Sequence, residues 1–323
     1  MNKINFLKIE IIISILSIFI PGCKNNPVND IIAPYDLRWI PQPCGTKANL
    51  NAVQFFDESI GIVAGDNGTI LRTTDGGNSW VHVCSGTVEN LYGLHFFNSK
   101  TGYVVGSSSI VMKTTDRGLS WRMQYSDSNH VLYSVYSSEG GYTYAAGSGG
   151  FIIKSNTMDI NWKQQHNIDT NDLFCVKQPL LVICSGANGT MLVSSDFDTA
   201  WTKINAGNGT NLNSIYFVNS FVGYAAGGQG IILKTSDRGM SWINEQSHST
   251  SRISTIKFGF DTCSGFAIGE NGMFLKTTDC GSNWKSVKTT TTDFLRDVYF
   301  INAKTGWATG DNGLILHTTT GGE

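Results

Sequence analysis

Hydrophobic and polar residues alternate along short segments of this chain, and turn-forming residues separate the segments. The first clear segment is 50–56, Leu-Asn-Ala-Val-Gln-Phe-Phe, which alternates as a half-buried β-strand does. An apolar segment follows at 61–65, and Asp-Asn-Gly at 66–68 then predicts a tight hairpin, because Asn-Gly readily adopts the positive φ that such turns require. Further strands are predicted at 69–74 and 80–83. Together these segments predict four antiparallel strands.

The same pattern recurs along the chain, and a tryptophan marks each repeat. The marker residues are Trp39, Trp80, Trp121, Trp162, Trp201, Trp242 and Trp284, with spacings of 41, 41, 41, 39, 41 and 42 residues. A period of about 40 residues with strand-like content is typical of a β-propeller blade. Inner strands begin at residues 50, 91, 132, 173, 212, 253 and 295. We therefore predict an all-β, seven-bladed β-propeller of four-stranded antiparallel blades.

The seventh repeat lacks a fourth strand. Its inner strands and its hairpin at 311–313 are present, but the sequence reaches Glu323 without a fourth strand. Near the other end, Arg38-Trp39-Ile40-Pro41 has the sequence of a fourth strand and no blade of its own. We expect 38–41 to complete the C-terminal blade, because an incomplete sheet would leave an open edge. The propeller would then span 38–323.

Composition agrees with one large β domain and argues against a nucleic-acid-binding protein. The 323 residues include 36 Gly and 6 Pro, and 15% are charged, which suits many short strands joined by turns. The formal net charge is −2, so the chain lacks the basic field that attracts nucleic acid.

The first residues have the features of an export signal. Two lysines precede the apolar run 11–20, which is shorter than the roughly 20 residues of a spanning helix. The following Pro-Gly-Cys resembles a bacterial lipoprotein box, in which Cys23 is lipidated. We expect a lipoprotein signal peptide at 1–22, a flexible tether at 23–37 and, because no acidic residue directly follows Cys23, an anchor in the outer membrane facing the periplasm. An ordinary secretory signal is the alternative.

Three repeats contain the full pattern Ser/Thr-x-Asp-x-Gly-x-Ser/Thr-Trp, the Asp-box of sialidases and related propellers, and two others retain its Asp and Trp. The Asp and Trp residues of these boxes are Asp75, Trp80, Asp116, Trp121, Asp196, Trp201, Asp237, Trp242, Asp279 and Trp284. One carboxylate per turn is too few for calcium, which takes about six to eight oxygen ligands. We interpret the boxes as structural: the Asp accepts hydrogen bonds within its turn, and the Trp fills the space between blades.

The segment from Gly61 to Trp80, Gly-Ile-Val-Ala-Gly-x-Asn-Gly-x-Ile-x-x-Thr-Thr-Asp-Gly-Gly-x-Ser-Trp, resembles the photosystem II stability and assembly factor family. The resemblance recurs in every blade between Arg38 and Glu323 and implies the propeller fold. In photosynthetic organisms that family is a non-enzymatic assembly chaperone that binds membrane-protein intermediates. The resemblance therefore implies an assembly-factor-like, protein-binding scaffold that is not an enzyme.

A sialidase-like or glycan-binding propeller is the alternative function, because sialidases share the Asp-box and the fold. Sialidase chemistry needs three arginines around the substrate carboxylate and a tyrosine nucleophile. Of the seven arginines, only Arg252 and Arg296 are expected near the axis on the face away from the Asp-boxes. Two arginines are too few, so we expect no catalysis.

Export to an oxidising compartment permits disulfides. Cys263 and Cys280 fall in two turns on one face of the sixth blade, and Cys175 and Cys184 fall on adjacent strands of the fourth. Both pairs are candidate disulfides. No Cys-x-x-Cys or Cys-x-x-His spacing occurs, so we predict no metal site and no cofactor.

The face that carries the connections between blades is the candidate partner-binding face. The second residues of the inner strands are expected to form a ring there, with two residues of adjoining connections beside it: Asn51, Tyr92, Tyr133, Phe174, Asn213, Ser254 and Arg296, with His130 and Arg252. Aromatic and arginine side chains around a shallow concavity suit protein or peptide recognition. The alternative is that the aromatic residues pack between blades as ordinary core. We expect a monomer with a protein or peptide partner.

Overall fold

The computed structural model describes residues 38–322, except 139–140, 157–160, 167–168, 179, 195–199, 207–208 and 260. Contacts divide the chain into Met1–Asp36 and Leu37–Glu323, and all described residues belong to the second unit. Cys23, the proposed signal peptide and the proposed tether lie outside the described residues. Among the described residues, no helix has the length and apolar character needed to cross a membrane.

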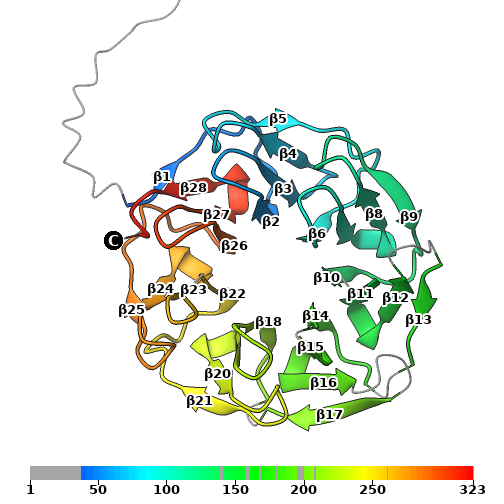
Figure 1. Ribbon diagram of the computed structural model, residues 1–323, viewed down its shortest axis with the longest axis vertical. Coiled ribbons are helices and arrows are strands. Elements are labelled where there is room, and N and C mark those ends of the chain that lie inside the picture. Colours follow the sequence, from blue (N-terminus) through cyan, green and yellow to red (C-terminus); the bar gives the residue numbers. More distant parts are fainter. Residues whose placement is uncertain are drawn as a thin grey trace, which may run out of the picture. The chain divides into compact units, whose positions relative to one another are not determined.

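Seven four-stranded antiparallel sheets form blades around a central axis (Figure 1), which confirms the predicted fold. Blades 1 and 2 contain β2 (Leu50–Phe55), β3 (Gly61–Gly65), β4 (Ile70–Thr73), β5 (Val81–His82), β6 (Leu91–Phe96), β7 (Gly102–Gly106), β8 (Val111–Thr114) and β9 (Arg122–Tyr125). Blades 3 and 4 contain β10 (Leu132–Ser137), β11 (Tyr142–Gly147), β12 (Ile152–Asn156), β13 (Lys163–Gln164), β14 (Leu173–Lys177), β15 (Val182–Gly186), β16 (Thr190–Ser194) and β17 (Trp201–Asn205).

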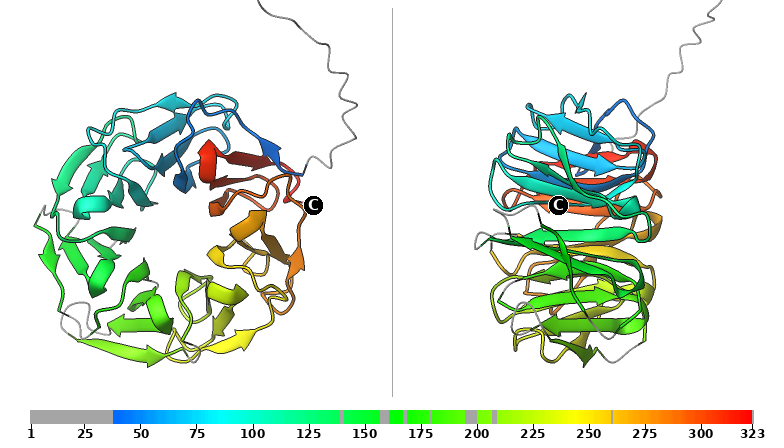
Figure 2. Two further views of the ribbon diagram at one scale, coloured as in Figure 1. Left: turned by 180° about the vertical axis from the view of Figure 1, so that it is seen from behind. Right: turned by 90° about the vertical axis from the view of Figure 1, so that its right-hand side faces the viewer.

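The remaining blades repeat this order. Blades 5 and 6 contain β18 (Leu212–Phe217), β19 (Gly223–Gly227), β20 (Ile232–Thr235), β21 (Ile243–Glu245), β22 (Ile253–Phe258), β23 (Gly265–Gly269), β24 (Phe274–Thr277) and β25 (Lys285–Ser286). Blade 7 contains β26 (Leu295–Phe300), β27 (Gly306–Gly310), β28 (Ile315–Thr318) and β1 (Ile40–Pro41). The first strand of each blade surrounds the axis in both face-on views (Figures 1 and 2).

The seventh blade combines the two ends of the propeller, as predicted. Ile40 pairs with His317 and Pro41 with Leu316, so β1 forms the outer edge of this sheet. The preceding Trp39 is 1% exposed. The paired strand is shorter than the predicted Arg38–Pro41, because Trp39 turns inward toward blade 6 instead of extending the ladder.

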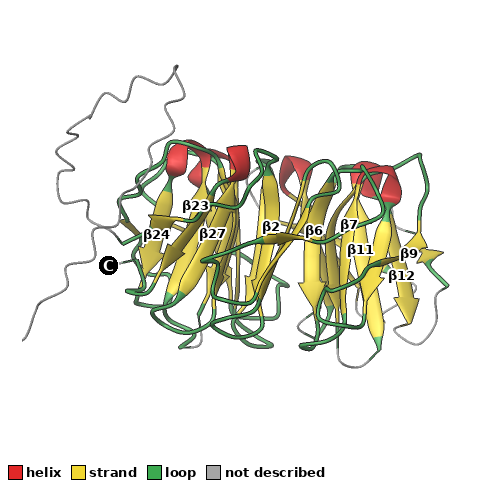
Figure 3. Ribbon diagram, turned by 90° about the horizontal axis from the view of Figure 1, so that it is seen from above, coloured by secondary structure: helices red, strands yellow, loops and turns green. Residues whose placement is uncertain are grey.

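Short 3₁₀ turns mark one face of the ring, which we call the upper face (Figure 3). They are η1 (Ser107–Ser109), η2 (Ser148–Gly150), η3 (Ala187–Gly189), η4 (Gly228–Gly230), η5 (Glu270–Gly272) and η6 (Asp311–Gly313). Asn67 and Asn312 adopt φ of 55° and 59° directly before a glycine, as expected for Asn-Gly turns. The inner strands begin at the upper face. The Asp-box turns follow the third strands and lie on the opposite, lower face.

The second strand of each blade is buried because neighbouring blades cover both of its sides. Every residue of the second strands is buried except Tyr142, at the start of β11. One cluster, for example, joins Ile62 of blade 1 to Val104 and Trp121 of blade 2. The core is therefore a series of layers between blades, and each side of a sheet contributes to a different layer.

One hydrogen-bond pattern holds the Asp-box turns. Asp75 accepts hydrogen bonds from the backbone N–H of Ser79 at 2.9 Å, from the Ser79 hydroxyl at 2.6 Å and from the Thr73 hydroxyl at 2.8 Å. The same contacts recur at Asp116 and Asp237, and at Asp279 the side-chain amide of Asn283 donates in place of the serine hydroxyl. At Asp279, hydrogen bonds from Asn283 and Thr277 lower the carboxyl pKa to about 2. Each carboxylate is thus occupied within its own turn.

The tryptophan after each box packs against the preceding blade. Trp121 joins the cluster that contains Ile62, and Gly118 lies so close that an added Cβ would be 2.6 Å from the Ile62 Cδ1. Buried and half-buried rings both occur: Trp121, Trp201 and Trp284 are buried, whereas Trp80 and Trp242 are half-buried. Asp196 lies outside the described residues. The described boxes hold blades together.

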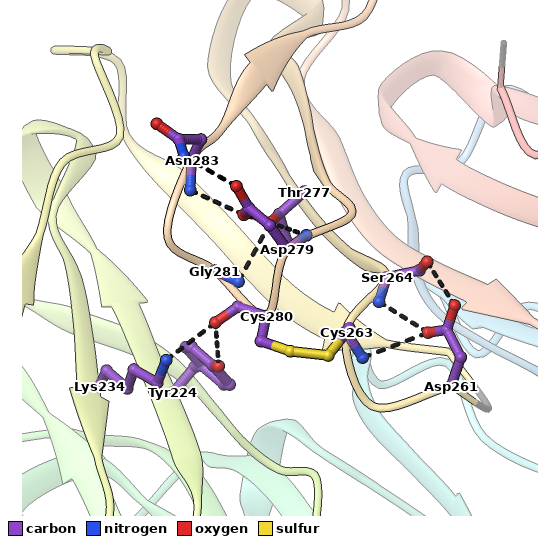
Figure 4. The surroundings of a disulfide bond; sticks show 10 residues. All are labelled: Tyr224, Lys234, Asp261, Cys263, Ser264, Thr277, Asp279, Cys280, Gly281 and Asn283. Atoms are coloured by element: carbon purple, nitrogen blue, oxygen red, sulfur yellow. Dashed lines mark hydrogen bonds between the residues drawn. A yellow bond between two sulfur atoms is a disulfide. The ribbon is translucent and has the colours of Figure 1, made fainter.

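A disulfide joins Cys263, between β22 and β23, to Cys280 in the Asp-box turn of the same blade (Figure 4). The other candidate pair is not bonded, because Cys175 and Cys184 are both free and buried. Cys184 lies opposite Val176 in the sheet, so its side chain and that of Cys175 point to opposite faces. Cys175 packs toward blade 5 and Cys184 toward blade 3. A shift of one residue in the register of the two strands would place both cysteine side chains on one face. The spacing of the cysteines in the sequence does not reveal this register.

Candidate functional site

A bulge in every blade positions the ring of second residues. The register of the inner strand shifts across this residue: Leu50 pairs with Gly65, and Ala52 pairs with Ala64. The other six blades show the same shift, and a bulge of this kind re-aims a side chain. The ring residues all line one cavity of about 140 Å³ at the upper end of the axis, here called the upper cavity: Asn51, Tyr92, Tyr133, Phe174, Asn213, Ser254 and Arg296.

Three polar members of the ring fasten one blade to the next. The Asn51 side-chain amide donates a hydrogen bond to the Leu91 carbonyl of blade 2 at 2.8 Å. Asn213 and Ser254 each donate to the equivalent carbonyl of the following blade at 2.6 Å. These side chains therefore stabilise blade junctions, while the Oδ1 atoms of Asn51 and Asn213 have no hydrogen-bond partner among the described residues.

The aromatic members form an arc across blades 2, 3 and 4. The Tyr92 and Tyr133 ring centres are 5.8 Å apart, and those of Tyr133 and Phe174 are 5.6 Å apart. All three residues are half-buried. Burial and the nearby Asp172 carboxylate raise the pKa of Tyr133, so its hydroxyl stays a donor at neutral pH. We call Tyr92, Tyr133 and Phe174 the aromatic arc. Their rings pack against one another and also line the upper cavity.

The two arginines and the histidine proposed for this face are not gathered in one place. Arg296 lines the upper cavity, and its Nε donates a hydrogen bond to Asp311. Arg252 is exposed outside the cavity, with its guanidinium 5.5 Å from the centre of the Phe294 ring. His130 stacks on a phenylalanine ring of blade 3 at 4.0 Å and also lies outside the cavity. The predicted site therefore contains the seven ring residues but neither Arg252 nor His130.

The described residues place neither a metal site nor a sialidase-type arginine cluster at the upper cavity. In the described part of the chain, no group of three or more His, Cys, Asp or Glu side chains is placed to hold a metal ion. Arg296 is the one arginine among the described residues that line this cavity. Tyr92, Tyr133 and Phe174 give this cavity an aromatic wall.

A second cavity, which sequence reasoning missed, lies on the axis toward the lower face. Its volume is about 340 Å³, and we call it the lower cavity. The fifth residues of the inner strands line it: Gln54, His95, Tyr136, Lys177, Tyr216, Lys257 and Tyr299. The alternation of the inner strands could have predicted these residues. Each fifth residue lies two positions after the small third residue, so both side chains point to the same side of the strand and face the axis.

His95 stays neutral in this cavity. Burial and then the ammonium groups of Lys177 and Lys257 lower its pKa from 6.5 to about 3. Its Nδ1 accepts a hydrogen bond from the Ser137 backbone N–H at 3.1 Å. Below pH 6.5 the unfolded chain binds a proton at this residue, whereas the folded chain does so only near pH 3. Stability should therefore decrease as the pH falls through this window.

We expect His95→Gln to flatten that pH dependence, because glutamine is not protonated and still offers an acceptor. Gln54, at the equivalent position of blade 1, accepts the corresponding N–H of Phe96 at 3.0 Å. Urea unfolding at a series of pH values between about 7 and 4 measures the effect. His82→Gln, at an exposed position of β5, is the matched control and should keep the parent profile. Parallel profiles for His95→Gln and the parent would contradict the assignment.

The fold and the two axial cavities define a seven-bladed β-propeller whose inner-strand side chains line its axis. The family model of the photosynthesis system II assembly factor YCF48 matches residues 33–123, which extend into β9 of blade 2. This match covers less than a third of the chain, and the likeness to solved YCF48 structures is a likeness of fold.

Solved structures share the fold over most of the chain. YCF48 bound to D1 peptide is 18% identical with a TM-score of 0.73, covering 88% of this chain and 97% of that one. YCF48 from Cyanidioschyzon merolae is 18% identical with a TM-score of 0.71, covering 87% and 98%. The WD40 repeats of RRP9 are 9% identical with a TM-score of 0.76, covering 89% and 99%. No curated protein sequence matches significantly.

Proposed function

We propose that this protein is a non-enzymatic, assembly-factor-like scaffold that binds a protein or peptide over the aromatic arc. The observation that carries this proposal is the placement of Tyr92, Tyr133 and Phe174, which are half-buried, adjacent and directed to the upper cavity. Aromatic side chains of this kind supply much of the binding energy at protein interfaces. One solved propeller of the same fold is YCF48 bound to D1 peptide, which supports a peptide-type partner.

The size of the upper cavity favours a macromolecular partner over a small molecule. Its volume of about 140 Å³ is below the roughly 300–1,000 Å³ of small-molecule sites. A cavity of this size suits one anchoring side chain, while the rest of the partner lies across the upper face.

We also propose that the scaffold acts at the cell envelope, exported by residues 1–22 and anchored in the outer membrane through lipidated Cys23. The apolar run and the Pro-Gly-Cys sequence support this location. The disulfide between Cys263 and Cys280 also supports it, because such bonds persist in oxidising compartments.

Crosslinking and capture from membrane fractions of the native host test the proposal. The parent protein should retain a partner, and the double variant Tyr92→Leu/Tyr133→Leu should reduce capture by about tenfold or more, because truncating interface aromatics costs about 2 kcal/mol each. Phe221→Leu, at an exposed aromatic of a lower-face turn, should leave capture intact. Undiminished capture by the double variant would refute partner binding over the aromatic arc. Recovery of the protein only in soluble fractions would refute membrane anchoring through Cys23.

A further inference from the structure

The lower cavity has the size and walls of a small-molecule site. Its volume of about 340 Å³ lies within the range of about 300–1,000 Å³ usual for such sites. The half-buried rings of Tyr136, Tyr216 and Tyr299 line it, together with the apolar side chains of Val53 and Phe217. Aromatic walls with a few polar groups are typical of ligand pockets.

Its polar groups leave an excess of positive charge. Lys257 is paired with Asp297, with 2.6 Å between Nζ and Oδ1. Lys177 has no carboxylate partner among the described residues, and its Nζ lies 5.4 Å from the centre of the Tyr136 ring. Both ammonium groups oppose protonation of His95, which shows that their field reaches into the cavity. A half-buried cation without a counter-charge favours an anionic ligand.

Three hydroxyl donors face the same space. Burial raises the pKa of Tyr136, and burial together with the neighbouring tyrosine raises the pKa of Tyr216 and Tyr299. All three hydroxyls therefore keep their protons at neutral pH. Within the described residues, none of them forms a hydrogen bond to another protein group. A ligand that offers acceptor oxygens would use this unused donor capacity.

We propose that the lower cavity binds the carboxylate of a small organic acid that contains a ring. Lys177 supplies the charge partner, the tyrosine hydroxyls donate hydrogen bonds, and the tyrosine rings pack against the ring of the ligand. A single negative charge matches the one ammonium group that lacks a carboxylate, and carboxylate oxygens accept several hydrogen bonds at once. The lower cavity contains none of the aromatic-arc residues, although Lys177, Tyr216 and Lys257 also line the upper cavity. The proposed ligand does not depend on the proposed protein partner.

Calorimetric titration with benzoate tests the site, and benzamide serves as the neutral analogue. Benzoate should bind, benzamide should bind at least about tenfold more weakly, and Lys177→Gln should weaken benzoate binding by about tenfold or more, the usual effect of losing a charged hydrogen-bond partner. Tyr136→Phe should weaken it less. Lys285→Gln, at an exposed lysine of β25, is the matched control and should not change it. Thermal melts of each variant check the fold.

A bound carboxylate should also change the titration of His95, followed by NMR. The charged side chains around this imidazole are Lys177, Lys257 and Asp297, the last paired with Lys257. Added negative charge near these ammonium groups should raise the pKa of His95 from about 3, whereas benzamide should not. An unchanged His95 titration at saturating benzoate would place the ligand elsewhere.

Other results would overturn the proposal. Equal binding of benzoate and benzamide would show that charge is not recognised. No saturable binding of benzoate up to about ten millimolar would refute the site. An N-acetylated peptide with a free C-terminal carboxylate tests the other source of this group. Tighter binding of that peptide than of benzoate would refute a small-molecule ligand and assign the lower cavity to a protein terminus.

Discussion

Replacing Trp39 with alanine is expected to lower the free energy of unfolding by about 3–5 kcal/mol, the usual cost of deleting a buried aromatic side chain. Trp39 is 1% exposed, and its ring lies 4.7 Å from the Phe274 ring of blade 6 and 5.8 Å from the Phe300 ring of blade 7. It precedes the two residues that pair β1 with β28. The substitution therefore removes packing at the junction where the N-terminal strand closes the propeller.

Urea unfolding measures this change, and Trp162→Ala provides the matched control. Trp162 is a marker tryptophan of another blade, but it is half-buried, and its ring centre lies 6.1 Å from that of Tyr103. Its loss should cost clearly less. Deletion of residues 38–43 should destabilise the protein more than Trp39→Ala, because the whole closing strand disappears. Unfolding curves that match the parent for both Trp39→Ala and the deletion would refute closure by this segment.

A second large effect is expected at Trp307, which falls outside the tryptophan period. Its ring is fully buried and stacks on Phe55 of blade 1, with 3.5 Å between ring centres and 8° between planes. The Nε1 of Trp307 donates a hydrogen bond to the Gly76 carbonyl at 3.0 Å. Trp307→Ala should cost about 3–5 kcal/mol, because it removes both the stacking on Phe55 and the hydrogen bond to Gly76.

The variant Trp307→Phe separates the two contributions. It keeps an aromatic ring against Phe55 and removes one of the two hydrogen bonds to the Gly76 carbonyl, which still accepts from the Gln42 side-chain amide at 3.2 Å. The loss of this one bond should cost about 0.5–1.5 kcal/mol. The same urea measurement should therefore rank the parent, Trp307→Phe and Trp307→Ala in decreasing order of stability. Equal stability of the parent and Trp307→Ala would show that the last and first blades are held together by other contacts.

Local patterns predicted most of the architecture. The alternation of hydrophobic and polar residues predicted the strands, and the Asn-Gly and Asp-box turns predicted where strands end. The tryptophan period predicted the number of blades. These features depend on residues near one another in the chain, so they can be read from each repeat separately. The closing strand was predictable for the same reason, since 38–41 has the form of a fourth strand and the last repeat lacks one.

Side-chain positions around the axis were less predictable. The ring of second residues was anticipated, but the bulge that aims it and the bonds from Asn51, Asn213 and Ser254 to the next blade were not. Pairing of Cys175 with Cys184 was wrong because register places them on opposite faces of the sheet. Arg252 and His130 lie outside the upper cavity because they belong to connections and not to the inner strands.

The sequence by itself determined the repeat, the strand order within a blade and the place where the ring closes, because each follows from short-range periodicity and turn chemistry. Only the tertiary structure decided which residues from different blades meet. Lys177, Lys257 and three tyrosines are separated by many residues in the chain, and they share the lower cavity only because seven inner strands converge on one axis. Trp307 gained its role in the same way, since its partner Phe55 becomes a neighbour only when the last blade meets the first.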